Sequence, residues 1–273
     1  MPRCWTMATS QGYHSLILQT PEGCRVTHRF FFMAGLPRTG STVLSAILSQ
    51  NPKIHSGPAS PVCPIMRDLT LGISEGSFTE MSVANRPDFQ AEIIGNVPHL
   101  YYRDVHKPFI VDKSRDWLHP RNMDLIRAYM TPEPKVLVLL RDKEAIIDSF
   151  TKLWKKNGVP PSQIKGLVAD ATWKVSYYCD EIIPTVKAWQ EILNGNSVHR
   201  GDSALTNDQF LFVEYEKFME DPAQTLAGIY RFFQLEPYAH SFVDISADEI
   251  ENDAVVGPEW KGLHQVRPAL AGV

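Results

Sequence analysis

The chain has 273 residues, of which 44% are hydrophobic and 21% are charged, and its formal net charge is −4. These proportions are typical of a globular protein and exclude collagen-like, low-complexity and intrinsically disordered chains. A net negative charge provides no overall basic surface for nucleic acid, so any binding site for an anion must be local.

The four cysteines and nine histidines show no metal-binding spacing. No CxxC pair occurs, and neither HxxxH nor HExxH is present, which argues against a zinc knuckle, a redox dithiol or a helical metal site. The most apolar run, residues 30–37, is far shorter than the ~20 residues of a membrane span. The N-terminus does not have the pattern of a signal peptide. We therefore expect a soluble, cytoplasmic protein without a metal site, a membrane span or a nucleic-acid partner.

Residues 1–27 are expected to form an N-terminal extension, and residues 28–273 a single α/β domain. Four short apolar runs in this domain are typical of strands buried on both faces. They cover residues 29–34, 108–111, 135–140 and 209–213. Helical patterns follow the strands at residues 42–49, 122–130, 143–156 and 221–233, and a longer helical stretch over 167–193 is interrupted by Pro184. This alternation predicts an α/β, P-loop-like three-layer fold with a central parallel sheet flanked by helices.

The loop after the first strand carries the strongest motif, Gly35-Leu-Pro-Arg-Thr-Gly40-Ser41-Thr42. Two glycines separated by four residues, between a strand and a helix, match the spacing of a P-loop. Backbone N–H groups and the positive end of the helix are suited to bind a phosphate there. The lysine that follows the second glycine in triphosphate-binding proteins is replaced by Ser41, and the cation is Arg38 inside the loop.

A second anion site is indicated after the 135–140 strand. Arg141 stands at its carboxyl end, where open α/β sheets bind ligands, and Ser149 comes eight residues later in the next helix. A planar guanidinium binds phosphate through two N–H groups at once. An arginine that only pairs with a neighbouring carboxylate would give the same pattern.

The segment Leu36-Pro-Arg-Thr-Gly-Ser-Thr42 resembles the 5′-phosphosulfate loop of sulfotransferases, and the pair Arg141 and Ser149 resembles their 3′-phosphate site. The resemblance implies the donor 3′-phosphoadenylyl sulfate (PAPS), with PAP as product. In that family the cation that corresponds to Arg38 touches the bridging oxygen of the leaving group. The residues implied as cofactor-binding by these two motifs are Arg38, Thr39, Gly40, Ser41, Thr42, Arg141 and Ser149.

Three shorter matches extend the resemblance. Tyr215 begins a stretch, Tyr-Glu with Pro222 seven residues after the tyrosine, that resembles the adenosine contact of the family. Lys261 lies in a Trp-Lys-Gly segment similar to the one that closes on the 3′-phosphate, and Lys113, just past the second strand, resembles a lysine that stabilises the transferring sulfuryl group. A packing tyrosine, a flexible tail and a surface lysine are the alternative interpretations.

The resemblance implies an enzyme that moves a sulfuryl group in line to a hydroxyl or amine of an acceptor, with Arg38 and Lys113 as catalytic residues and no metal. The general base stays unassigned. Tyrosylprotein and heparan enzymes place a glutamate where this chain has residues 57–60, and no carboxylate stands there. The possible substitutes are His55, Asp68, Asp112 and Asp116.

Two other functions stay open. One is a P-loop kinase or nucleotide hydrolase with Asp142 as a metal-binding carboxylate, although the Gly-Lys pair is missing. The other is a non-catalytic module that binds PAP or PAPS and has no base. The acceptor is expected to contact segments 60–105 and 160–200, which contain Tyr101, Tyr102, Trp173, Tyr177 and Tyr178, while the acidic run from Asp244 to Asp253 is expected to be solvated. The sequence leaves the oligomeric state and the acceptor undetermined.

Overall fold

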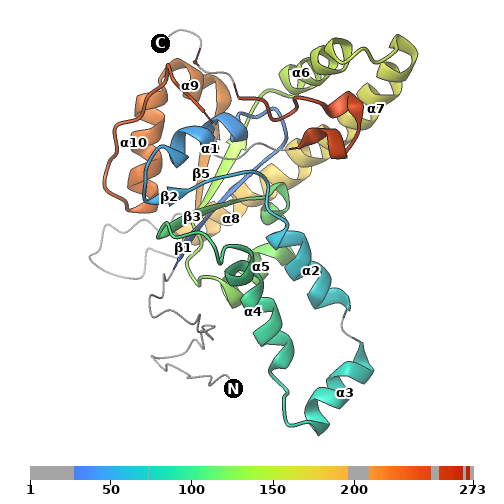
Figure 1. Cartoon of the computed structure of the whole chain (residues 1–273), viewed down its shortest axis with the longest axis vertical. Coiled ribbons are helices and arrows are strands. Elements are labelled where there is room, and N and C mark those ends of the chain that lie inside the picture. Colours follow the sequence, from blue (N-terminus) through green and yellow to red (C-terminus); the bar gives the residue numbers. More distant parts are fainter. Residues whose placement is uncertain (1–27, 73, 196–208, 247–251, 267–268, 271–273) are drawn as a thin grey trace.

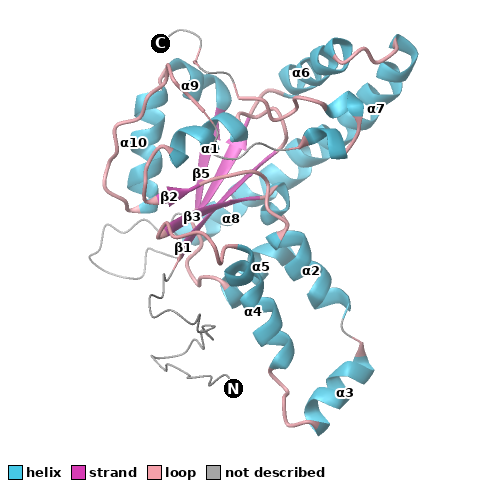
Figure 2. Cartoon of the chain, viewed as in Figure 1, coloured by secondary structure: helices cyan, strands magenta, loops and turns pink. Residues whose placement is uncertain are grey.

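The computed structural model describes residues 28–72, 74–195, 209–246, 252–266 and 269–270, so the predicted extension at residues 1–27 lies outside it. Within these ranges a parallel five-stranded sheet has the order β2-β3-β1-β4-β5. Its strands are β1 (Arg29–Gly35), β2 (Ile54–His55), β3 (Phe109–Lys113), β4 (Val136–Leu140) and β5 (Phe210–Glu214). Helices pack on both faces of the sheet (Figures 1 and 2), which confirms the predicted α/β fold.

The two faces carry different sets of helices. One face is packed by α1 (Ser41–Ser49), α9 (Tyr215–Glu220) and α10 (Pro222–Phe233). The other is packed by α2 (Val62–Gly72), α4 (Phe89–Tyr101), α5 (Pro120–Tyr129), α6 (Lys143–Lys156), α7 (Pro161–Tyr177) and α8 (Ile183–Gly195), and by the short helix η1 (Arg115–Leu118). The helix α3 (Glu75–Val83) buries none of its residues and projects away from the sheet (Figure 1).

The central strand β1 is buried on both faces because its side chains alternate between two aromatic clusters. Phe31 stacks on Phe233 of α10 with ring centroids 4.0 Å apart, whereas Phe32 meets Trp117 of η1 at 5.2 Å on the opposite face. Each buried phenylalanine contributes roughly 1.5–3 kcal/mol. This packing fixes the carboxyl end of β1, and therefore the loop that follows it, in the middle of the sheet edge.

Several boundaries differ from the sequence prediction. The strand β3 extends to Lys113, so this lysine is the last residue of the strand rather than a residue beyond it. The long helical stretch changes just before Pro184: α7 ends at Tyr177, a π-helical turn η2 (Tyr178–Ile182) follows without a break, and Pro184 is the second residue of α8. The elements β2, α2, α3, α4 and α9 were not predicted.

No helix in the described part of the chain combines the length and apolar character that crossing a membrane requires.

Candidate functional site

The phosphate loop joins β1 to α1 at the carboxyl edge of the sheet. Gly40 is the N-cap of α1 with φ of 88°, no described side chain caps the helix, and its first turn holds no acidic residue. The first N–H groups of a helix have no partner inside it. The N-terminus of α1 therefore presents uncompensated donors and a positive dipole end to an anion.

The loop is held tightly against its neighbours. A methyl group added at Gly35 would lie 2.8 Å from Cβ of Leu139 and 2.9 Å from the Thr39 hydroxyl, so only glycine allows this close approach to β4. The Thr39 hydroxyl donates to the carbonyl of Leu36 at 2.7 Å, and the Thr39 N–H donates to the same carbonyl at 3.3 Å. Thr39 thus closes the turn, and its contact with a cofactor stays a prediction.

Arg38 lies where three parts of the chain meet. Its backbone is left-handed, with φ of 72°, which directs the side chain across the loop. Its Nε donates to the Ser149 hydroxyl of α6 at 2.9 Å, and its Nη1 donates to the carbonyl of Leu263 near the C-terminal end. The structure therefore brings two predicted site residues, Arg38 and Ser149, into direct contact.

Arg141 completes the cluster on the other side of the loop. Its Nη1 donates to the Arg38 carbonyl at 2.7 Å, and its guanidinium lies 4.2 Å from the ring centroid of Tyr215. Its Nε is buried and has no hydrogen-bond partner among the described residues, with the Glu216 carboxylate 3.9 Å away. A buried guanidinium N–H without a partner fits an anionic ligand, because leaving such a donor unsatisfied is costly.

Gly40 provides a direct test of this cluster. A Cβ at this position would lie 2.7 Å from Cδ2 of Tyr215, and the φ of 88° disfavours any other residue. We expect Gly40→Ala to displace the Tyr215 ring from Arg141 and to lower PAP affinity at least tenfold, measured by calorimetry. Gly158→Ala is the matched control, because Gly158 has φ of 74° with no atom within 4 Å of an added Cβ. Equal PAP affinity of the two variants would contradict the placement of Tyr215 at the ligand.

The C-terminal segment is fastened to α6 beside the loop. Trp260 packs against Phe150 and Trp154, with ring centroids 5.9 and 5.6 Å away. The amide of Asn157 donates to the carbonyls of Glu259 and Lys261 at 2.8 and 2.9 Å. The segment that contains Lys261 therefore lies at the site, although the Lys261 side chain is exposed and its contact with a phosphate stays a prediction.

Lys113 lies at the same edge of the sheet, paired in register with Met33 of β1. Its side chain is 6% exposed, so it is no ordinary surface lysine. Its neighbour Asp112 is fully buried and accepts hydrogen bonds from Ser60 at 2.6 Å, Tyr102 at 2.8 Å and Trp117 at 2.7 Å. Burial raises the pKa of the Asp112 carboxyl. A carboxyl that is enclosed in this way cannot reach an acceptor, so Asp112 is excluded as the general base.

The other candidate bases have partners of their own, Asp68 at an exposed position and Asp116 and His55 at half-buried ones. Asp68 and Asp116 pair with Arg67 at 3.1 and 3.4 Å, and His55 packs edge-on against the ring of Tyr102 at 5.5 Å. Cys63 is no alternative nucleophile, because burial raises the pKa of its thiol to about 12. The geometry singles out none of these groups as the base.

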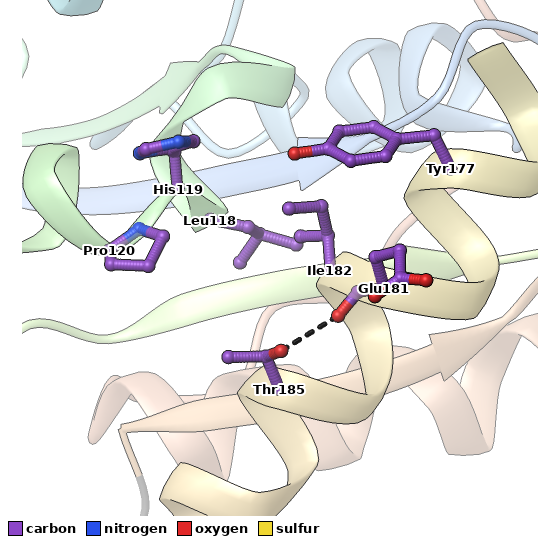
Figure 3. Close-up of a pocket in the computed structure, with 7 residues that line it drawn as sticks. All are labelled: Leu118, His119, Pro120, Tyr177, Glu181, Ile182 and Thr185. Carbon is purple, nitrogen blue, oxygen red and sulfur yellow. Dashed lines mark hydrogen bonds between the residues drawn. The ribbon is translucent and has the colours of Figure 1, made fainter.

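Two cavities lie next to η1, on the side of the sheet expected to hold an acceptor. One has a volume of about 410 Å³ and separates the start of α5 from α7 and α8; the Tyr177 hydroxyl and the His119 ring face each other across it (Figure 3). The other, of about 260 Å³, is lined by Arg67, Asp116 and again His119. Of the aromatic residues predicted near the acceptor, Tyr177 lines the larger cavity, Tyr101 and Trp173 are exposed, and Tyr102 and Tyr178 belong to the core.

Two acidic residues outside the cluster have structural partners. The Asp142 carboxylate caps α6, accepting the Ala145 N–H at 2.8 Å, which is a structural alternative to metal binding. Asp253 was expected in a solvated run, but its side chain is only 9% exposed and pairs with the His264 ring at 2.6 Å. This expectation was wrong for Asp253, because the N–H and the ring of His264, 11 positions later, both bind its carboxylate.

The family follows from a comparison with sequence families. The model of the sulfotransferase family matches residues 31–240, which is more than half of the chain. This protein therefore belongs to the sulfotransferase family. The matched range includes the phosphate loop, Lys113, Arg141, Ser149 and Tyr215, and ends before Lys261.

Solved sulfotransferase structures resemble the chain at low identity. The sulfotransferase domain of the Synechococcus PCC 7002 olefin synthase is 22% identical, with 81% of this chain and 78% of that chain covered and a TM-score of 0.45. The sulfotransferase from Alicyclobacillus acidocaldarius is 15% identical, with 82% and 86% covered and a TM-score of 0.49. The sulfotransferase domain from the curacin biosynthetic pathway is 19% identical, with 92% and 82% covered and a TM-score of 0.45. No curated protein matches the sequence.

Proposed function

We propose that this protein transfers a sulfuryl group from PAPS to a hydroxyl or amine of an acceptor. The observation that carries the proposal is the meeting of Arg38, Ser149, Arg141 and Tyr215 around the uncapped N-terminus of α1. Two guanidinium groups and a free helix end within one cluster suit a ligand with two separate anionic groups.

Each part of the donor has matching residues in the cluster. The N–H groups at Ser41 and Thr42, together with Arg38, would hold the 5′-phosphosulfate, which supplies the sulfuryl group when bound. Arg141 and Ser149 would hold the 3′-phosphate, with Lys261 from the C-terminal segment. Tyr215 would contact the adenosine. The buried, unpartnered Nε of Arg141 supports this assignment, because an anion would satisfy it.

The chain's contribution to the reaction is electrostatic. Negative charge develops on the leaving phosphate oxygen, so donors that are already fixed near it lower the barrier most. Arg38 is fixed by Ser149 and by the Leu263 carbonyl, and Lys113 by its burial at the end of β3. The acceptor also needs a base within hydrogen-bond reach, and this group stays unassigned.

A thermal-shift titration tests donor recognition. PAP, 5′-AMP and Mg-ATP are compared at equal concentrations, since a ligand at 100 times its Kd stabilises a fold by about 2.7 kcal/mol. We expect PAP to raise the melting temperature well above 5′-AMP. Stabilisation by Mg-ATP alone would favour a kinase or nucleotide hydrolase instead. Binding of PAP without transfer from PAPS to any member of a broad acceptor panel would favour a non-catalytic module.

A further inference from the structure

Asp112 is a fully buried carboxyl next to Lys113, and the proposed reaction does not use it. Its two oxygens accept hydrogen bonds from three segments: the Ser60 hydroxyl after β2, the Tyr102 hydroxyl at the end of α4, and the Trp117 indole of η1. All four side chains are buried. Donors from three separate segments therefore meet at the residue before Lys113.

The main chain of Lys113 is held by the same residues. The Ser60 N–H donates to the Lys113 carbonyl at 2.9 Å, while the Ser60 hydroxyl donates to Asp112 at 2.6 Å. On the other side, the N–H of Ser114 donates to the carbonyl of Met33 in β1 at 3.0 Å. Ser60 thus binds Asp112 and Lys113 at once, and the end of β3 is fixed between the loop and the central strand.

We propose that Asp112 is a positioning residue, which holds the loop at Ser60 and the helix η1 against the end of β3 and so directs Lys113 to the reaction centre. The inference rests on the proposed function, in which Lys113 is a donor that stabilises the charge developing during sulfuryl transfer. Side chains of consecutive strand residues point to opposite faces. Asp112 therefore acts from the face covered by η1, while Lys113 lies on the other face at the carboxyl end of β3. A displacement of about 1 Å at a reacting group can lower a rate ~10²-fold.

The chemistry of Asp112 distinguishes positioning from proton transfer. An asparagine can keep the same three contacts: its oxygen accepts from Trp117, and its NH₂ group donates to the hydroxyl oxygens of Ser60 and Tyr102, which are able to accept. We therefore expect Asp112→Asn to keep kcat within a few-fold of the unmodified protein, with the same pH profile. Asp112→Ala leaves three donors without an acceptor and should lower kcat about 10²-fold.

The deciding readout does not depend on sulfuryl transfer. Lys113 is modified with acetic anhydride under limiting conditions, and its rate relative to exposed lysines is followed by mass spectrometry. We expect slow acetylation of Lys113 in the protein without substitutions and in Asp112→Asn. In Asp112→Ala the acetylation should be at least fivefold faster. Ser60→Ala and Tyr102→Phe each remove one contact of Asp112. Each should therefore raise the acetylation rate of Lys113 by a smaller factor, which keeps the test usable if Asp112→Ala does not fold.

The matched control is Asn51→Ala. Asn51 is a buried polar residue whose amide donates to the Tyr230 hydroxyl at 2.9 Å. It precedes β2, whose Ile54 pairs with Phe109 at the opposite end of β3 from Lys113. Its loss should lower the melting temperature and leave the Lys113 modification rate unchanged. An equal rate increase in this control, or an unchanged rate in Ser60→Ala and Tyr102→Phe, would overturn the positioning role.

Kinetics provide the second arm. If Asp112 acts through Lys113, Ser60→Ala lowers kcat when Lys113 is present, but it has no further effect on kcat in a protein that already carries Lys113→Ala. An equal decrease in kcat with and without Lys113 would overturn the proposal. Loss of activity in Asp112→Asn while Lys113 is still acetylated slowly would overturn it as well. If the protein transfers no sulfuryl group at all, the modification rates still decide the positioning of Lys113, and only the proposed function fails.

Discussion

Replacement of Arg38 by alanine is expected to lower kcat for sulfuryl transfer by about 10²–10³-fold, the usual effect of removing one preorganised donor at a developing negative charge. The guanidinium is held in place by Ser149 and the Leu263 carbonyl, so it is a preorganised donor. Turnover with PAPS and a responsive acceptor measures the effect, and PAP binding by thermal shift shows that the variant still folds.

Two variants make the Arg38 result interpretable. Arg38→Lys keeps the charge but not the fork that contacts both α6 and the C-terminal segment, so its kcat should fall between those of the unmodified protein and the alanine variant. Arg127→Ala is the matched control, since Arg127 contacts Asp124 and Gln209, outside the cluster. Near-normal turnover of Arg38→Ala would contradict the assigned role.

Replacement of Arg141 by alanine is expected to weaken PAP binding by roughly 1.5–3 kcal/mol, about 10–150-fold in Kd, the contribution of a hydrogen bond to a charged group. Titration calorimetry with PAP and with 5′-AMP measures it. The loss should be much smaller for 5′-AMP, which has no 3′-phosphate.

The comparison between the two ligands is the critical one. Arg141 also binds the Arg38 carbonyl and lies over Tyr215, so its removal loosens the loop for any nucleotide. An equal loss for PAP and 5′-AMP would mean that Arg141 only supports the loop, and unchanged affinity for PAP would contradict the 3′-phosphate assignment outright. Arg127→Ala again serves as the control.

The parts of the site that follow from local sequence were predictable. The β1 strand, the loop with Arg38, and the helix at residues 143–156 are recognisable because hydrophobic pattern, glycines and capping residues all lie within a short window. The rule that the carboxyl ends of parallel strands share one edge predicts that Arg38, Arg141 and Ser149 lie near one another. The direct contact of Ser149 with Arg38 was not predicted, because the sequence pairs Ser149 with Arg141.

The remaining contacts depend on tertiary structure. The Leu263 carbonyl reaches Arg38 across 225 positions, and any residue type has a carbonyl, so no sequence signal marks it. The Asp112 network draws on Ser60, 52 positions away, and the strand that places the Ser60 loop, β2, has only two residues. The helix α3 buries no side chain, so its sequence has too weak an amphipathic pattern to predict a helix there.

The left-handed backbone of Arg38 has a consequence for engineering this protein. A non-glycine residue at φ of 72° costs about 1–2 kcal/mol relative to an unstrained conformation, and glycine adopts it freely. Glycine at position 38 would relieve this strain, but it would remove the cation of the phosphate loop together with its hydrogen bonds to Ser149 and the Leu263 carbonyl. Stability and activity oppose each other at this residue, so stabilising substitutions belong elsewhere in the chain.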